Sequence, residues 1–94
     1  MKINDEEVKL IITPLAIRKT EENDSQFDIL GLLRNIEEKV EPRLTDYYKL
    51  IYAGYLGAKP EEEITFDEFL KLVEDIDIIE INHVGIELLL QRKN

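Results

Sequence analysis

Residues 44–70 read LTDYYKLIYAGYLGAKPEEEITFDEFL, a stretch that predicts two helices separated by a polar gap. The first helix is expected to begin at about Pro42 or Thr45 and to end at Leu56. Its apolar and aromatic side chains recur at three- and four-residue spacing, which is typical of a helix that buries one face. The residues of this stripe are Leu44, Tyr48, Ile51 and Tyr55. We expect Gly57 to be the left-handed C-cap, because glycine tolerates a positive φ.

The second helix begins at the clearest local signal in the chain, a capping box. The Thr65 hydroxyl is expected to accept a hydrogen bond from the Glu68 amide, while the Glu68 carboxylate accepts one from the Thr65 amide. Ile64 and Phe69 stand where a hydrophobic staple would pack. The apolar residues expected on one side of this helix are Phe66, Phe69, Leu70 and Val73.

The part of the chain before this stretch predicts a hairpin and two more helices. Residues 1–12 contain an alternating, β-branched segment that favours a short hairpin, with Val8, Leu10 and Ile12 on one face. Thr13 followed by Pro14 indicates a helix start and predicts a helix over 15–22, which 23–25 interrupts.

A second helix is expected over about 26–40, capped by Ser25 or Asp24 and ended before Pro42. Gly31 lies inside this helix and lowers the stability of the helix by up to about 1 kcal/mol relative to alanine. We expect this glycine to let a neighbouring segment approach the helix closely.

The last helix is predicted over 78–91, with Asp75 or Asp77 as its cap. Its apolar residues cover more than one face, so the helix is either buried or partly an interface. These residues are Ile78, Ile79, Ile81, Ile86, Leu88, Leu89 and Leu90.

The composition fits one small domain. The chain has 94 residues, of which 44% are hydrophobic and 35% charged, enough for one modest core. The fold class is therefore mainly α (α+β), with a short N-terminal β-hairpin packed on a compact bundle of about five helices. We expect a single domain over 1–94, with the hairpin in 1–12 and the helical part in 13–94.

The charge balance limits the partners that the chain is expected to have. Its formal net charge is −9, from 21 acidic and 12 basic residues, which disfavours nucleic acid and anionic membrane surfaces. Such a field attracts basic protein segments, although an acidic balance can equally be only a solvated surface. The N-terminus lacks the apolar stretch of a signal peptide, and no apolar run is long enough to span a bilayer. A cytoplasmic protein is expected.

Calcium binding is the first chemistry to consider, because an acidic residue opens a helix at Glu68. If Glu68 ended an EF-hand loop of about twelve residues, its first position would fall on Gly57 and its third on Lys59. Neither residue supplies a side-chain oxygen ligand, and Glu62 occupies the position that requires glycine. A helix cap explains Thr65 and Glu68 without a metal.

Other catalytic or metal chemistry is also not expected. His83 is the single histidine, and the chain has no cysteine, so Glu80 and Glu87 on the same helical face make at best a weak metal site. The acidic pairs fall in predicted turns and exposed faces rather than across a cleft. We expect no enzyme activity, no cofactor and no metal.

The four tyrosines are the candidate protein-binding residues. Tyr48, Tyr52 and Tyr55 share one flank of the predicted helix, and Tyr47 lies on another flank with Ile51. Tyrosine buries a large ring and keeps a polar tip, so it suits the edge of a core and an interface equally well. Both roles remain open for these rings.

The order of the segments resembles the tail assembly chaperones of long-tailed bacteriophages and of prophages in Gram-positive hosts. The likeness covers nearly the whole chain, and its most telling part is an Ile-Tyr-Ala-Gly helix followed by a polar gap and a capped Thr-Phe-Asp-Glu helix. The matching segments are 1–4, 8–10, 13–22, 27–30, 32–33, 50–56 and 64–70.

This resemblance implies a non-catalytic chaperone that binds the tape-measure protein and helps to recruit tail-tube subunits around it. Many members are made in two forms, the longer by ribosomal frameshifting, and this chain resembles the short form. Self-association into a homo-oligomer is a further possibility for so small a core. Two alternatives are a small acidic regulator, such as an antitoxin-like or anti-repressor protein, and a calcium-dependent helical switch.

Overall fold

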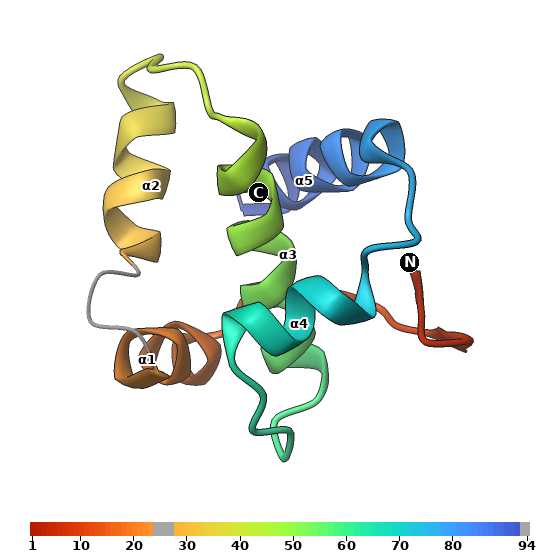
Figure 1. Cartoon of the computed structure of the whole chain (residues 1–94). Helices are drawn as coiled ribbons and strands as arrows, with labels where there is room; N and C mark the ends of the chain where they lie inside the picture. Colours follow the sequence, from red (N-terminus) through yellow and green to blue (C-terminus); the bar gives the residue numbers. More distant parts are fainter. Residues whose placement is uncertain (24–27, 93–94) are drawn as a thin grey trace.

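The computed structural model describes residues 1–23 and 28–92, and it confirms a mostly helical α+β fold with a short N-terminal hairpin. In this part of the chain α3 runs through the middle and contacts α1, α2, α4 and α5 (Figure 1). The elements are β1 (Lys2–Ile3), β2 (Glu6–Glu7), α1 (Pro14–Asn23), α2 (Ile29–Glu37), α3 (Leu44–Ala58), α4 (Phe66–Leu72) and α5 (Ile78–Arg92).

The hairpin is shorter than predicted and lies closer to the N-terminus. β1 and β2 are antiparallel, with Lys2 opposite Glu7 and Ile3 opposite Glu6. The two turn residues, at 4 and 5, have φ of 52° and 63°, which is the two-residue turn that matches the twist of a hairpin and that Asn and Asp tolerate.

The prediction that residues 8–12 form a strand is wrong for 9–12, because no strand in the described part of the chain pairs with them. Val8 still continues the hairpin, since its amide donates to the Met1 carbonyl at 2.8 Å and its carbonyl accepts from the Met1 amine at 3.0 Å. Along this segment Val8 and Leu10 are buried and Ile12 is half-buried, as expected for one face. This segment crosses α3, where the Ile11 amide donates a hydrogen bond to the Gly54 carbonyl at 3.1 Å. The apolar alternation therefore reflects packing on a helix rather than pairing in a sheet.

Gly57 is not a left-handed cap. It lies inside α3, which continues to Ala58, and none of the described glycines has a positive φ. A Cβ at Gly57 would lie 1.8 Å from the Ile11 carbonyl oxygen. Glycine is required here because the crossing segment approaches the helix so closely.

The start of α1 agrees with its predicted cap. The Thr13 hydroxyl accepts a hydrogen bond from the Ala16 amide at 3.1 Å, and α1 begins at Pro14 and ends one residue later than expected, at Asn23.

Helix α2 begins and ends inside its predicted range of 26–40. The proposed caps Asp24 and Ser25 lie outside the described residues, and Asp28 caps the helix instead by accepting from the Gly31 amide at 2.8 Å. A side chain at Gly31 would collide with this cap rather than with another element. The helix ends at Glu37 because residue 39 turns left-handed, with φ of 64°, and the amide of residue 40 bonds back to the carbonyl of residue 35.

Helix α3 begins at Leu44, between its two predicted starts. The Asp46 carboxylate accepts a hydrogen bond from the Arg43 amide at 2.8 Å, which satisfies a backbone donor at this end of the helix.

The capping box of α4 is confirmed. The Glu68 amide donates to the Thr65 hydroxyl at 3.1 Å, and the Thr65 amide donates to the Glu68 carboxylate at 2.9 Å. For α5, Asp77 is the cap, since its carboxylate accepts from the Ile79 amide at 2.7 Å. The starts of α4 and α5 are therefore determined by hydrogen bonds between residues at most three apart in the sequence.

The hydrophobic core is shared between α3 and the elements around it. Each described helix and the first strand contribute fully buried side chains to it. They include Ile3, Ala16, Ile29, Leu50, Ile51, Tyr52, Leu56, Phe69, Val73 and Ile81. In the described part of the chain, no helix has the length and apolar character needed to cross a membrane.

Candidate protein-binding surface

Two of the four tyrosines lie in the core. Tyr52 is 1% exposed; its hydroxyl donates to the Ile64 carbonyl at 2.6 Å, and its ring centroid lies 5.5 Å from that of Phe66. Tyr55 is 7% exposed and its ring lies 5.3 Å from that of Phe69. Of the two roles left open by the sequence, packing in the core is the one that Tyr52 and Tyr55 have here, because these two rings have almost no surface to offer a partner.

The environment of Tyr55 changes its acidity as well as its exposure. Burial raises the pKa of the Tyr55 hydroxyl above its ordinary value, and the negative charge of Glu62 raises that pKa further. The hydroxyl is therefore held in its neutral form, which suits a packing residue.

The other two tyrosines are half-buried on α3. Tyr47 packs directly on Gly85 of α5, where an added Cβ would lie 2.3 Å from the Tyr47 ring. Tyr48 packs against the edge of the core. The fold thus distributes the four rings between the core and its rim and does not assemble them into one patch; a partner-binding role remains a prediction for Tyr47 and Tyr48.

Helix α5 presents an apolar face that the rest of the described chain leaves uncovered. On its inner side Ile81 and Leu88 are 0% and 4% exposed. On the opposite side Ile79 is 78% exposed and Leu90 58%. We call the outer residues Ile79, His83, Ile86 and Leu90 the α5 stripe; their spacing places them on one helical face.

The two edges of the α5 stripe differ in charge. Glu80 and Glu87 are the only charged residues in 78–91, and the helical repeat places both of them along the same edge. Asn82 and Leu89 lie along the other edge. The stripe is therefore apolar except at His83, acidic along one edge and uncharged along the other.

His83 lies within this stripe and is largely exposed. Its Nε2 atom is 3.1 Å from a carboxylate oxygen of Glu87, and the two side chains are 74% and 58% exposed. An exposed pair of this kind contributes little to stability. Among the described residues, no group of three or more histidine, cysteine, aspartate or glutamate side chains is arranged to hold a metal ion.

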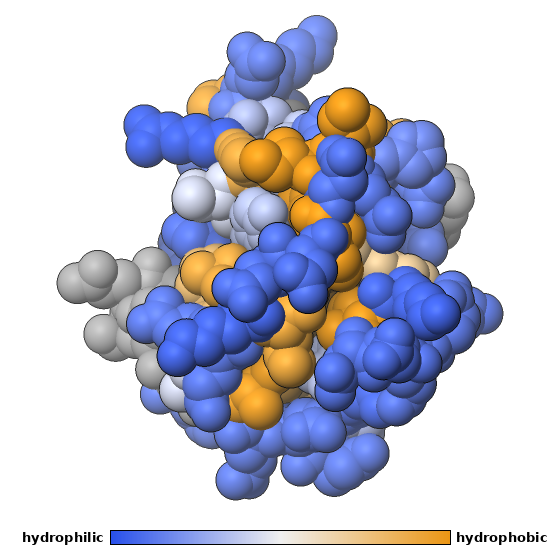
Figure 2. Space-filling model, turned by 45° about the vertical axis from the view of Figure 1, so that its right-hand side comes forward, coloured by the Kyte–Doolittle hydropathy of each residue, from blue (hydrophilic) through white to orange (hydrophobic). Residues whose placement is uncertain are grey.

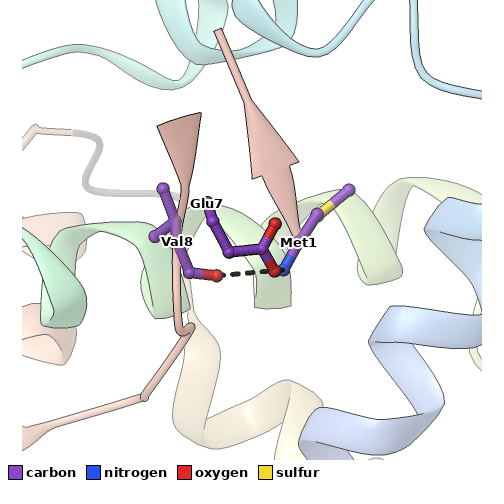
Figure 3. A network of polar contacts seen from close by, with 3 residues as sticks. All are labelled: Met1, Glu7 and Val8. Carbon is purple, nitrogen blue, oxygen red and sulfur yellow. Dashed lines mark hydrogen bonds and ion pairs between the residues drawn. The ribbon is translucent and has the colours of Figure 1, made fainter. Parts of the chain in front are cut away.

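A groove of about 410 Å³ runs beside the acidic edge, between α5 and the N-terminal segment. Val84, Glu87 and Leu88 form its α5 side. Across the groove the Met1 amine donates to the Val8 carbonyl at 3.0 Å and lies 3.1 Å from the Glu7 carboxylate (Figure 3). The N-terminal segment also contributes Lys9 to the lining of this groove.

Hydrophobic side chains reach the surface on several elements of the described chain. Figure 2 shows a band of hydrophobic residues bordered on both sides by hydrophilic ones. The other large apolar residues that are at least two-fifths exposed are Ile11, Leu15, Leu30, Val40, Leu44 and Ile78. They come from several elements, whereas the α5 stripe is a continuous row on one helix.

Two features of α5 were not predicted from the sequence. The sequence indicates that α5 is apolar on more than one face, but not which residues face outward. The packing of Tyr47 on Gly85 was not predicted either, although a glycine between apolar residues of a helix is a signal of close packing.

Comparisons of this chain with protein-family models, with curated proteins and with solved structures find no match.

Proposed function

We propose that this protein is a phage tail assembly chaperone, a non-catalytic module that binds the tape-measure protein in the host cytoplasm and helps tail-tube subunits to assemble around it. The observation that supports this most is the α5 stripe, an exposed row in which three of four residues are apolar, on a helix whose opposite face is already in the core. Soluble chains rarely leave such a row uncovered unless it meets a partner. The resemblance of the ordered segments supplies the identity of that partner.

The proposed mechanism is protection of an aggregation-prone chain. A long helical partner exposes apolar stripes until the tail tube surrounds it, and an apolar helix face can cover such a stripe reversibly. The net charge of −9 would keep the complex soluble and attract basic segments of the partner. Neither step requires a catalytic group.

Gene order is the first test. The gene is expected to lie between those of the major tail protein and a very long, coiled-coil-rich protein, and a location elsewhere would remove the proposal. The second test is co-expression of the full chain with that long protein. We expect co-purification and a larger soluble fraction of the long protein; recovery of an equally insoluble partner would contradict the chaperone role.

A further inference from the structure

We infer that the α5 stripe is the docking site for an amphipathic helix whose apolar face is bordered along one edge by lysine or arginine. This inference rests on the proposed function, since it names the surface and the chemistry by which the partner is bound. It commits to more than that function requires, because a chaperone of this size could use any of several exposed apolar residues.

The dimensions of the stripe fit a single helix. From Ile79 to Leu90 it spans eleven residue steps, or about 16 Å along the axis. Its members recur at intervals of four, three and four residues, so they form one row that can interdigitate with a matching row. Ile79 and Leu90 are the most exposed apolar members, at 78% and 58%, and therefore have the most surface to bury.

The charge asymmetry specifies the partner further. Glu80 and Glu87 lie one above the other along one edge, two helical turns apart. Residues 78–91 contain no lysine or arginine, and His83 Nε2 lies 3.1 Å from the Glu87 carboxylate. Glu87 also lies on the wall of the groove between α5 and the N-terminal segment, but Lys9 and Met1 line the same groove. A cation of the partner is therefore expected to approach the two carboxylates from the side of the stripe and not through the groove. A lysine or arginine could lay its aliphatic stem on the stripe and place its cation beside the carboxylates.

A second copy of this chain fits the same surface less well. Two α5 helices paired antiparallel across a twofold axis would bring the acidic edge of one copy against the acidic edge of the other. Paired in parallel, each acidic edge would meet the uncharged edge that contains Asn82 and Leu89 and would gain nothing. With a net charge of −9 on each copy, a basic partner is favoured over self-association.

The probe for this inference is a pair of synthetic helical peptides. Both have leucines at the spacing of the α5 stripe; one has lysines along one edge and the other has glutamates at the same positions. In fluorescence anisotropy with the full chain, the lysine peptide is expected to bind at least about tenfold more tightly than the glutamate peptide at low salt. This ratio is expected to fall toward one at about 0.5 M NaCl, because salt screens exposed charges.

Three variants of the chain locate the binding site. Ile79→Gln with Leu90→Gln is expected to weaken lysine-peptide binding by about tenfold or more, because it removes apolar contact area. Glu80→Gln with Glu87→Gln is expected to weaken it by about threefold to tenfold and to reduce its salt dependence. The matched control removes two exposed carboxylates from the loop before α4, and is expected to leave binding within about twofold. That control is Glu61→Gln with Glu63→Gln.

The outcomes separate this inference from the proposed function. If wild-type chain co-purifies with the tape-measure protein and the Ile79→Gln, Leu90→Gln variant does so equally, the docking site is elsewhere and the inference is overturned, while the function stands. If the lysine peptide binds as described but no tape-measure protein is retained, the function falls and the docking site stands. If sedimentation shows a wild-type dimer that this variant dissociates, a second copy occupies the stripe and the inference is wrong. Circular dichroism of each variant establishes that the fold is intact.

Discussion

Tyr52 illustrates how one residue can be suited to two roles until its surroundings are known. A tyrosine among apolar residues on a helix is compatible with a binding surface, yet this ring lies between Phe66 and Phe69 and its hydroxyl caps the Ile64 carbonyl. The hydrogen bond satisfies the only polar group that burial would otherwise penalise. Its contribution is therefore to the stability of the α3–α4 contact.

Removal of the Tyr52 hydroxyl is expected to destabilise the fold moderately, and removal of the ring severely. Tyr52→Phe should lower the free energy of unfolding by about 1 kcal/mol, because the Ile64 carbonyl loses its donor. Tyr52→Ala should lower it by about 3–5 kcal/mol, because it leaves a cavity in the core. Urea unfolding followed by circular dichroism measures both values. Tyr48→Phe, at a half-buried position, is the control, and an equal loss there would contradict the role of the hydroxyl.

Gly57 is the residue at which helix propensity and packing disagree most. Alanine would favour the helix by about 1 kcal/mol, but its Cβ would meet the Ile11 carbonyl oxygen at 1.8 Å. Since that oxygen belongs to the backbone, the segment must move, and Gly57→Ala is expected to cost about 1–3 kcal/mol net. At Gly54 the nearest atom is the Leu10 Cβ at 3.0 Å, so Gly54→Ala should cost less. Thermal unfolding of the two variants in parallel checks this order, and a reversed order would contradict it.

At the scale of the elements, the helix starts are determined by short-range hydrogen bonds and the faces by long-range packing. The capping box of α4 forms as its four residues predict, whereas the buried side of α5 depends on α3, against which it packs. The closest point of that contact is Tyr47 on Gly85. An apolar helix with two comparable faces therefore becomes half core and half surface only when its neighbour is in place.

The capping box makes the stability of α4 depend on pH. Hydrogen bonds from Thr65, first from its backbone amide and second from its side chain, lower the pKa of the Glu68 carboxyl below its ordinary value. A group whose pKa is lower in the folded state stabilises the fold at pH values above its unfolded pKa, and this contribution disappears as the pH falls through the folded pKa.

Glu68→Gln is the variant that isolates this effect, because glutamine can still accept the Thr65 amide but does not ionise. We expect the stability advantage of the wild type over Glu68→Gln to be present at about pH 6 and to vanish toward about pH 3. Thermal melts over this range measure the difference, and carbon-13 titration of the Glu68 carboxyl measures its pKa directly. An advantage that grows on acidification would contradict the cap.

At the scale of the whole molecule, acidic charge dominates the surface, and the few basic residues hold separate segments together. The Lys59 ammonium pairs with the Glu6 carboxylate, which links the end of α3 to the hairpin, and this hydrogen bond raises the pKa of Lys59. The Lys19 ammonium donates to the Pro60 carbonyl and so links α1 to the loop after α3. The remaining carboxylates repel one another across the surface.

Salt is therefore expected to stabilise the free protein while it weakens the docking of a basic partner. Raising NaCl from about 0.02 M to about 0.5 M shortens the screening length from roughly 20 Å to a few Å, and a gain of about 1 kcal/mol would raise Tm by about 4–8 °C. The variant with Glu61→Gln and Glu63→Gln has two fewer negative charges and should show a smaller rise. A Tm that stays constant or falls with NaCl would mean that self-repulsion is not significant.

Several features that depend on neighbours in sequence were predicted from the sequence alone, although the Asp28 cap of α2 was not. The Thr13 cap before α1, the capping box at Thr65 and the Asp77 cap of α5 each form between residues at most four apart, so the same residues favour them in any fold. Helical spacing likewise predicted the number and approximate positions of the described helices.

Only the tertiary structure decided which side chains meet across the fold. Gly57 was expected to end a helix. Instead it lets the backbone of Ile11, 46 residues earlier in the chain, pass close to α3, and the Ile11 carbonyl oxygen is the nearest atom. Tyr52 is in the core and Ile79 on the surface because of how α4 and α5 pack around α3, not because of their own flanking residues. The sequence by itself determined the helices and most of their caps. The contacts between elements decided which helix faces became core and which became the candidate docking surface, because burial is a property of the assembled fold.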